Sequence, residues 1–468
     1  MMPRLGLLVA VVLLVLIGIV MVFSASTVEA IHNGESATSY VVKQAIFVVL
    51  GSVLALFVYT RDYRSLQGGP FFWVFWGVCA ALLLAVPVIG TNILGATRWI
   101  YIGGFSVQPT EFAKIMLVVA AAKVLLEYRD QIRDMKQALI VAFVLVLLPL
   151  AFLYKTQSDM GSAVVILVGV FVVMWLGGLP GRFVAALGIA VVVAGVFGIV
   201  GYRADRVSVW LDPWSDQYDT GYQMIRSFFA FSEGGILGVG LGNSREKFLY
   251  LPEAETDFIF SIIGEELGFV GALFVIALFV AVLVGGLLIA KRASDDFGTM
   301  IAGGLTCMLV GQAFLNMACA TGLFPTTGKP LPFISSGGSS VVASLLMVGI
   351  IMSVSRVAGE EALTPHRASA ERRRANLNYI RVEDEPPARS RFSSVESEPI
   401  AEHPARSRRS HGDPFGGVMA PRGGASRSAS RGSSRPEGNA SMGSRASRRH
   451  DSGMERGANR RGSGRNSR

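Results

Sequence analysis

The sequence predicts an all-α polytopic membrane protein with ten transmembrane helices, and three observations support this fold class. Of the 468 residues, 51% are hydrophobic and only 16% are charged, and the mean hydropathy is +0.48, which is more apolar than a soluble domain tolerates. Apolar runs of the ~17–25 residues needed to cross a bilayer recur along the chain. Lysine and arginine gather in alternate short loops between these runs, which is typical of membrane proteins.

Ten apolar runs are long enough to span a membrane. They cover roughly residues 5–25, 42–59, 71–90, 110–127, 137–154, 161–178, 182–201, 267–290, 298–320 and 339–356. The first run follows a lone Arg4 and resembles a signal peptide, but its length favours a retained helix. One set of loops holds the basic residues Arg61, Arg64, Arg129, Arg133, Lys136, Arg182, Lys291 and Arg292. Because short basic loops face the cytoplasm, both termini are predicted to be cytoplasmic.

The chain divides into a transmembrane domain, residues 1–356, and a tail, residues 357–468. A large extracytoplasmic loop, residues 202–266, joins the seventh and eighth helices, and a loop of this length is usually functional or locally structured. The tail is rich in Arg, Ser, Gly and Pro and has too few large apolar residues for a core, so we expect it to be disordered. It holds much of the net charge of +9, which favours anionic membrane lipids or an acidic partner over nucleic acid; a merely solvated tail is equally consistent.

Charged residues within or beside the apolar runs gather toward one leaflet. A charge at the centre of a membrane helix costs about 2.5–3.5 kcal/mol, so such residues usually have a function. Those toward the outer side are Glu111, Lys114, Lys155, Asp159, Asp257, Glu265, Glu266 and Lys329. Their distribution predicts one polar cavity that opens outward.

The segment Tyr250–Gly268, "YLPEAETDFIFSIIGEELG", concentrates acidic residues at the start of the eighth helix. Thr256 can cap that helix and Asp257 suits its first turn, so the carboxylate could simply begin the helix. Ser261 follows Asp257 by one turn, on a face of small or polar residues that a bulky substrate could approach. Glu265 lies nearer that face, whereas Glu266 points away from it and is expected to pair with Arg or Lys.

Arg98 has two interpretations. It stands beside aromatic residues in the segment Gly95–Lys114, "GATRWIYIGGFSVQPTEFAK". Such a cluster is typical of an anchor at the membrane interface, and this reading is favoured by composition. The alternative is an arginine that binds a phosphate group.

Several motifs, in this order along residues 22–356, resemble the SEDS family (shape, elongation, division and sporulation) of bacterial membrane proteins. They are "GATRWI", "QPTEFAK", "QSDMGSA", "GVGLGNSREKFLYLPEAETDFIFSIIGEELGF" and "GKPLPFISSGGSS". The "GNSREKFLYLPE" block is similar to the division and sporulation members. Four substitutions depart from the family pattern: Ser158 and Met160 replace a common Pro and Leu, Glu255 stands where His is frequent, and Ser336 where Tyr is frequent.

The resemblance implies a peptidoglycan glycosyltransferase that polymerises lipid II with inversion. Asp257 matches the family's essential aspartate and would act as general base. Arg98, Lys114 and Lys155, with Lys329 and Arg245 as weaker candidates, would stabilise the leaving undecaprenyl diphosphate. The other residues expected at the substrate site are Glu111, Asp159 and Ser336, with Glu265, Glu266 and Ser261 in support.

The resemblance also implies where the protein acts and with what. The expected location is the bacterial cytoplasmic membrane at the division septum, and the expected partners are lipid II, a class B penicillin-binding protein transpeptidase and other divisome proteins. No metal-ligand cluster is evident and no cofactor is required, although Asp257 or Asp159 could contribute an oxygen ligand to a divalent cation such as Mg²⁺ or Mn²⁺.

Two other functions stay open from the residues alone. A lipid II flippase would need similar cations, but alternating access requires a site near the midplane that is reachable from both leaflets. A scaffold without catalysis that recruits a transpeptidase is the second.

Overall fold

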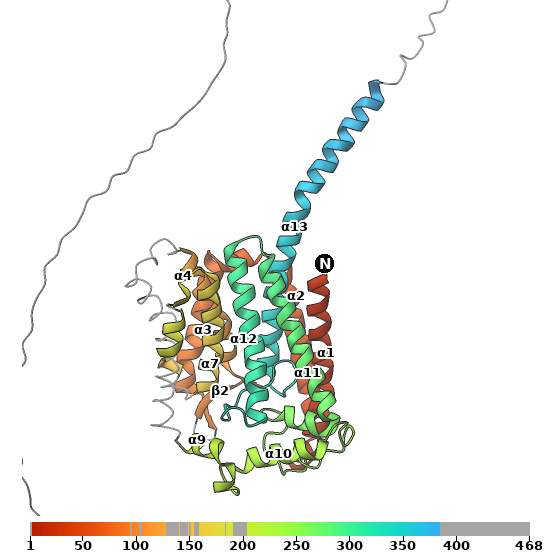
Figure 1. Cartoon of the computed structure of the whole chain (residues 1–468). Coiled ribbons are helices and arrows are strands. Elements are labelled where there is room, and N and C mark those ends of the chain that lie inside the picture. Colours follow the sequence, from red (N-terminus) through yellow and green to blue (C-terminus); the bar gives the residue numbers. More distant parts are fainter. Residues whose placement is uncertain are drawn as a thin grey trace, which may run out of the picture. The chain divides into compact units, whose positions relative to one another are not determined.

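The computed structural model describes residues 2–93, 96–102, 105–127, 140, 148, 151–153, 159–182, 184–190 and 204–383. Helices dominate these residues and run alongside one another as a bundle (Figure 1). The helices are α1 (Met2–His32), α2 (Ser39–Thr60), η1 (Tyr63–Leu66), α3 (Pro70–Ile89), α4 (Pro109–Glu127), α7 (Met160–Leu176), α9 (Ala204–Leu211), η3 (Pro213–Asp216), α10 (Tyr222–Gly234), α11 (Ile259–Lys291), α12 (Asp296–Ala320) and α13 (Gly338–Glu383).

Six of the described helices are long and apolar enough to cross a membrane, which supports a multi-pass membrane protein. They are α1, α2, α3, α11, α12 and the first part of α13. The shorter apolar helix α7 and the helix α4 coincide with the predicted spans 161–178 and 110–127. The predicted spans 137–154 and 182–201 lie largely outside the described residues, so the count of ten stays a prediction.

A small antiparallel sheet interrupts the helices and corrects the all-α expectation. Its strands are β1 (Thr91–Ile93), β2 (Ala96–Ile102) and β3 (Phe105–Val107), in the order β1-β2-β3. The β1–β2 pairing is irregular at Arg98, because Thr91 pairs with Trp99 and Asn92 with Thr97, so strand alternation does not give the direction of this side chain. Its Nη1 would lie 3.9 Å from a Cβ on Gly328, so Arg98 reaches the 321–337 segment. Aromatic and β-branched neighbours explain why the strand is extended.

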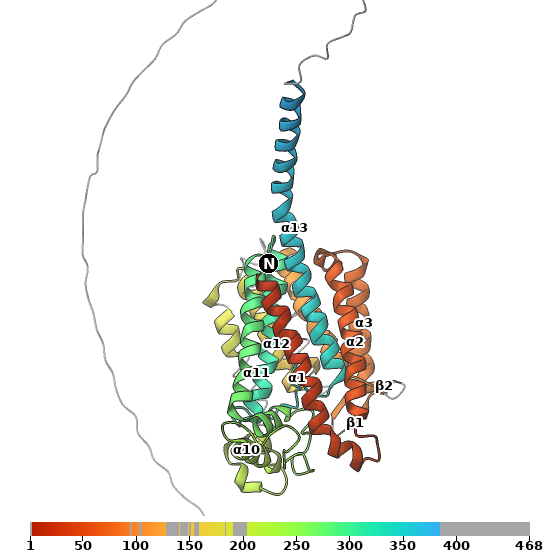
Figure 2. The same cartoon turned by 90° about the vertical axis from the view of Figure 1, so that its right-hand side faces the viewer.

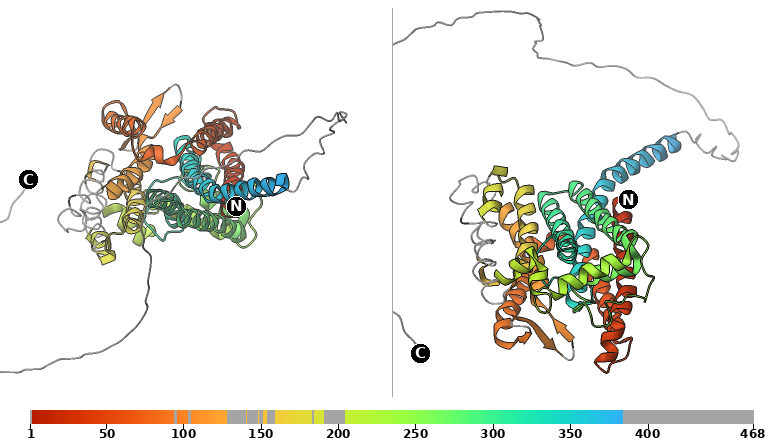
Figure 3. Two further views of the ribbon diagram at one scale, coloured as in Figure 1. Left: turned by 90° about the horizontal axis from the view of Figure 1, so that it is seen from above. Right: turned by 60° about the horizontal axis from the view of Figure 1, so that its bottom comes forward.

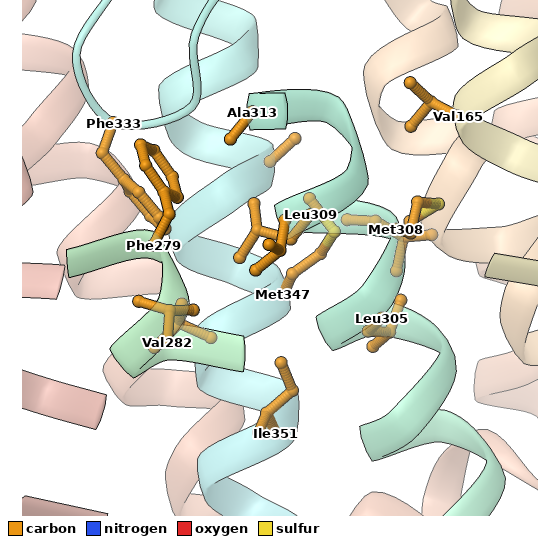
Figure 4. Packing of buried hydrophobic residues seen from close by; sticks show 14 of the residues in the cluster. Val165, Phe279, Val282, Leu305, Met308, Leu309, Ala313, Phe333, Met347 and Ile351 are labelled. Atoms are coloured by element: carbon orange, nitrogen blue, oxygen red, sulfur yellow. The ribbon is translucent and has the colours of Figure 1, made fainter. Parts of the chain in front are cut away.

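Helix α12 lies at the centre of the bundle, in contact with α4, α7, α11 and α13. Figure 4 shows its side chains Leu305, Met308 and Leu309 among buried residues from α7, α11 and α13. Gly304 of α12 meets Gly169 of α7, where a Cβ on either residue would lie 3.3 Å from the other's carbonyl oxygen. Small residues let these two backbones approach closely, as is common between membrane helices.

Helix α2 runs beside α13 (Figure 2), and α1 packs along α11 and against α2. At the end of the bundle away from the start of α1, which we call the loop end, α9 and α10 lie across the helices (Figure 3). The sheet, the turn before α11 and the 321–337 segment lie at this same end (Figure 1).

Helix α11 is broken at Gly268, whose backbone has φ 69° and ψ −169°. The break removes helical hydrogen bonds, and the glycine-rich segment 234–242 replaces them. The amides of Val239 and Gly240 donate to the carbonyls of Glu265 and Glu266 over 3.0 Å, and the amide of Phe269 donates to Gly235 over 2.9 Å. A broken membrane helix is tolerated when neighbouring chain satisfies its backbone in this way.

Two predicted boundaries differ from the structure. The loop predicted to end at Glu266 ends at Phe258, because the helical turns from Ile259 to Leu267 precede the break; the predicted span 267–290 begins at the break itself. The tail predicted to begin at Val357 begins inside α13, which continues to Glu383. Polar residues are compatible with helix outside a membrane, so composition did not mark this end. The rest of the tail lies outside the described residues.

Candidate active site

Asp257 lies in the turn at the loop end, two residues before the first residue of α11. The N-cap residue of α11 is Phe258, which makes no side-chain cap, so the predicted capping by Thr256 is wrong. The Thr256 hydroxyl instead donates to Oε2 of Glu253 over 2.7 Å. Asp257 is partly exposed. A Cβ added at Gly328 would lie 3.4 Å from Oδ2 of Asp257 and 3.9 Å from Nη1 of Arg98. Arg98 is also partly exposed. The structure therefore brings the Asp257 carboxylate and the Arg98 guanidinium within 4 Å of the same point beside Gly328.

Four charged side chains form a buried cluster below this turn. Nζ of Lys114 lies 2.8 Å from Oε2 of Glu111, one turn away on α4. Nζ of Lys329 lies 2.8 Å from Oδ2 of Asp159, and 4.0 Å from Oε1 of Glu111. All four side chains are 0–1% exposed. Two positive and two negative charges balance one another, as burial away from water requires.

The buried cluster changes the expected roles of its members. Glu111, Lys114, Asp159 and Lys329 are enclosed and paired, not open to a bound diphosphate. Opposite charges removed from water bind one another. The pairing of Lys329 with Asp159, 170 positions apart, could not be read from the sequence. Among the described residues predicted to contact substrate through a charge, Arg98 and Asp257 keep partial exposure. The candidate Lys155 lies outside the described residues.

Amide side chains that the sequence analysis did not select connect this cluster to the turn. Gln312 of α12 accepts from Lys114 Nζ over 2.5 Å and donates to the Pro330 carbonyl over 3.0 Å. Asn316, one turn further along α12, donates to the carbonyls of Asp257 and Lys329 over 2.8 and 2.7 Å. Both amides are buried within the apolar span 298–320. Polar side chains in a membrane span usually form hydrogen bonds with neighbouring segments, and this property could have identified Gln312 and Asn316 from the sequence.

The three predicted supporting residues hold the surrounding loop. Glu265 accepts from Ser244 Oγ over 2.6 Å and from the Arg245 amide over 2.5 Å. Glu266 pairs with Lys247 over 3.0 Å, in agreement with the expected cationic partner. Ser261 is within hydrogen-bond distance of Ser227 on α10, at 2.6 Å. All three are buried, so they organise the loop end and do not face the space beside Asp257.

Ser336 approaches the turn through its backbone. Its amide donates to the Glu255 carbonyl over 2.8 Å. The neighbouring Ser335, which was not predicted, donates from Oγ to the Thr256 carbonyl over 2.5 Å and accepts from the Leu331 amide over 2.7 Å. The 331–336 segment is therefore bonded directly to the chain that carries Asp257.

Two carboxyl groups of the outer loop, those of Glu255 and Glu246, have raised pKa values. Burial raises the pKa of Glu255 to about 7, and the negative charges of Glu253, Glu29 and Asp257 contribute to the rise. Burial likewise raises the pKa of Glu246 to about 7, although the nearby Arg226 opposes the rise. Glu255 is the closer of the two to Asp257 along the chain, so its charge state bears on the site.

Within the described residues, no three His, Cys, Asp or Glu side chains lie close enough together to hold a metal ion. Asp159 and Asp257, the two carboxylates considered for a divalent cation, also differ in setting. Asp159 is fully buried with Lys329, and Asp257 is partly exposed.

The family model of the FtsW, RodA and SpoVE cell cycle proteins matches residues 5–360 of this chain. The chain belongs to this family. It is the SEDS family that the motifs resemble. The FtsW/RodA/SpoVE match spans the sheet, the turn at Asp257, the buried cluster and α12, so every described residue of the site falls within it.

Relatives of this chain in the FtsW/RodA/SpoVE family include division and sporulation proteins. A probable peptidoglycan glycosyltransferase FtsW of Trichlorobacter lovleyi is 38% identical over 75% of this chain and 92% of its own length. Stage V sporulation protein E of Bacillus subtilis is 36% identical over 76% of this chain and 97% of its own length.

Solved structures of the family have the same fold. A chain from a peptidoglycan synthase complex, described as coordinating polymerization and crosslinking, is 30% identical with a TM-score of 0.62 and covers 75% of this chain and 97% of that one. Rod shape determining protein RodA of Thermus thermophilus is 28% identical with a TM-score of 0.55, covering 75% of this chain and 96% of that one.

Proposed function

We propose that this chain polymerises lipid II, the disaccharide peptide carried on undecaprenyl diphosphate, into β1,4 glycan strands of the septal cell wall. The chain is a peptidoglycan glycosyltransferase, the activity in the names of its FtsW relatives. Asp257 is the proposed general base. The observation that supports this assignment is the partly exposed Asp257 carboxylate beside Gly328, with the Arg98 guanidinium close to the same position on that glycine.

The proposed chemistry is an inverting displacement. The Asp257 carboxylate takes the proton of the acceptor sugar hydroxyl as its oxygen bonds to the anomeric carbon of the donor. The bond from that carbon to the diphosphate breaks at the same time, and the diphosphate leaves with the electron pair. A positioned base contributes typically ~10²–10⁴-fold to such a step. An α-linked diphosphate replaced by a β-linked sugar requires inversion at that carbon.

The leaving diphosphate gains negative charge, so a cation placed near it stabilises the transition state more than the ground state. We assign this role to Arg98, because it is partly exposed beside Asp257. Lys155 remains the second candidate. Lys114 and Lys329 are assigned to the buried cluster that supports the turn, since their charges are already paired.

The loop end is proposed to face the outside of the cytoplasmic membrane, with both termini in the cytoplasm. This orientation follows the basic loops and puts Asp257 where lipid-linked sugars are polymerised. A class B penicillin-binding protein is the proposed partner, which is supported by the similarity to a chain of a synthase complex that coordinates polymerization and crosslinking. The division septum and other divisome proteins are the proposed setting.

The test is polymerisation of labelled lipid II by the purified full-length protein in detergent, with products separated by length. Asp257→Ala and Asp257→Asn should lower the rate at least ~100-fold while the protein elutes and melts as the wild type does. Asp219→Asn, an exposed carboxylate in the same outer loop, is the matched control and should keep the wild-type rate.

The same assay separates the alternatives. Detergent offers no second compartment, so a flippase or a scaffold makes no polymer there. If Asp257→Ala polymerised lipid II at the wild-type rate, Asp257 would be excluded as the base. Addition of the transpeptidase partner should raise the wild-type rate and leave the Asp257 variants inactive.

A further inference from the structure

The backbone that carries Asp257 is held by donors from two other parts of the chain. Three consecutive carbonyls, those of Glu255, Thr256 and Asp257, each accept one hydrogen bond from outside the turn. The donors are the Ser336 amide at 2.8 Å, Ser335 Oγ at 2.5 Å and Asn316 Nδ2 at 2.8 Å, in that order. The turn lies before α11 begins, so helical hydrogen bonds of α11 do not hold it. These external donors hold the turn together with two bonds inside it, from the amides of Thr256 and Phe258 to the Glu253 carbonyl.

Asn316 has a special position among these donors. Its Nδ2 donates to the Asp257 carbonyl over 2.8 Å and to the Lys329 carbonyl over 2.7 Å. An amide nitrogen has two hydrogens, so both are used, and the two acceptors dictate which way the amide is oriented. The residue is 1% exposed. Asn316 thus ties the turn before α11 to the segment that follows Gly328, the glycine beside which Asp257 and Arg98 meet.

A second connection runs through the same segment. Lys329, whose carbonyl Asn316 holds, pairs with Asp159 through its side chain. Gln312, one turn before Asn316, holds the Pro330 carbonyl. Residues 329 and 330 are consequently bonded to the rigid central helix α12 on consecutive carbonyls. Asn316 therefore anchors both the segment and the turn to α12, and Ser335 and Ser336 bond the two directly to each other.

We propose that Asn316 is a positioning residue for Asp257: by binding the carbonyls of Asp257 and Lys329 together, it sets the distance and angle at which the Asp257 carboxylate meets the acceptor hydroxyl. Ser335 assists through the adjacent carbonyl. The proposal rests on the function of Asp257 proposed above. Neither residue contacts substrate. A displacement of about 1 Å in a catalytic group can cost on the order of 100-fold in rate, so loss of this anchor slows the chemical step more than it weakens substrate binding.

The test compares kcat and KM for lipid II polymerisation by the full-length protein and its variants in detergent. Asn316→Ala should lower kcat roughly 10–100-fold and change KM less than about two-fold. Ser335→Ala should lower kcat less. Because both residues hold the same turn, the loss in the double variant should be smaller than the product of the single losses.

Thr306→Val is the matched control. Thr306 is on α12 and fully buried, and its hydroxyl makes no hydrogen bond within the described part of the chain. This variant should keep kcat, KM and the melting temperature of the wild type, which shows that a buried change in α12 does not by itself slow catalysis.

The outcomes separate the two proposals. If Asp257→Ala is inactive while folded Asn316→Ala keeps the wild-type kcat, the positioning role is wrong and the base stands. If Asp257→Ala keeps its activity, the proposed base is wrong and the positioning role falls with it. A rise in KM comparable with the fall in kcat would show general distortion of the site and also overturn the role. Should Asn316→Ala fail to fold, Ser335→Ala decides, and an unchanged kcat there overturns the proposal.

Discussion

Lys329 donates a hydrogen bond from Nζ to Oδ2 of Asp159 over 2.8 Å, and both side chains are fully buried. The two residues are 170 positions apart in the chain. Asp159 also caps α7 by accepting from the Ser162 amide over 3.1 Å. The pair therefore joins the start of α7 to the segment that flanks the candidate site. A buried ion pair adds little net stability compared with apolar residues, but loss of one partner leaves an uncompensated charge.

Lys329→Met should destabilise the protein strongly. The substitution leaves Asp159 buried without its cation, which typically costs ~3–5 kcal/mol of the free energy of unfolding. The measurement is denaturant or thermal unfolding of the purified protein in detergent. Lys43→Met removes one side of the exposed Lys43–Glu35 pair and should cost less than ~1 kcal/mol.

The double variant Lys329→Met/Asp159→Asn isolates the charge effect. With both charges removed, much of the stability lost in Lys329→Met should return. If the single variant were as stable as the wild type, the buried pair would not exist in the folded protein.

Gly268→Ala should also destabilise the protein. Gly268 has φ 69° and ψ −169°, a conformation that is almost confined to glycine and costs other residues ~1–3 kcal/mol, and a Cβ there would collide with the Gly238 amide nitrogen. The alanine must therefore displace the glycine-rich segment that satisfies the broken helix. Unfolding in detergent again gives the measurement.

Gly77→Ala is the matched control for Gly268→Ala. Gly77 lies within α3, and a Cβ there would have no atom within 4 Å. Alanine should leave stability unchanged or raise it by up to ~1 kcal/mol, because glycine is the poorer helix former. Equal effects of the two substitutions would argue against the break at Gly268.

Glu255→Gln should alter the pH dependence of activity. Burial raises the pKa of Glu255 to about 7, so the group is mostly neutral below that pH and ionised above it. Ionised Glu255 adds a negative charge near Asp257 and the diphosphate substrate. We expect wild-type kcat/KM to fall as pH rises through about 7, and the fall to be smaller in Glu255→Gln when measured from about pH 6 to about pH 9. Parallel curves for the two proteins would assign the fall to another group.

Glu246→Gln should alter the pH dependence of stability. Burial raises the pKa of Glu246 to about 7 from an ordinary value of 4.5. Between these two values the folded protein binds the proton more than the unfolded chain does, so the free energy of unfolding decreases as pH rises from about 4.5 to about 7 and is level above that. The glutamine variant should show a shallower decrease, with Glu255 accounting for part of what remains.

The control for Glu246→Gln is Glu35→Gln, which removes an exposed carboxylate whose pKa is lowered chiefly by a hydrogen bond from Ser39. It should leave the slope between about pH 4.5 and about pH 7 intact. If the free energy of unfolding of Glu246→Gln depended on pH as steeply as that of the wild type, the Glu246 carboxyl group would have an ordinary pKa in the folded protein.

The site was partly readable from the sequence. Glu111 and Lys114 are three residues apart on one helix, so their pairing follows from helical spacing. Glu266 was expected to bind a cation and binds Lys247. Asn316 was missed because it lies in an apolar span without charge, and its role depends on acceptors 59 and 13 positions away. The strand around Arg98 was missed because its aromatic residues also suit a membrane interface.

The sequence by itself determined which segments are apolar enough to cross a membrane, the family, and the presence of an aspartate before the eighth predicted span. These properties are local, since hydropathy and motif spacing need only neighbouring residues. Only the tertiary structure decided that Lys114 and Lys329 are buried with carboxylates while Arg98 stays partly exposed beside Asp257. Burial and charge pairing depend on residues far apart in the chain that packing brings together, and no local pattern records that distance.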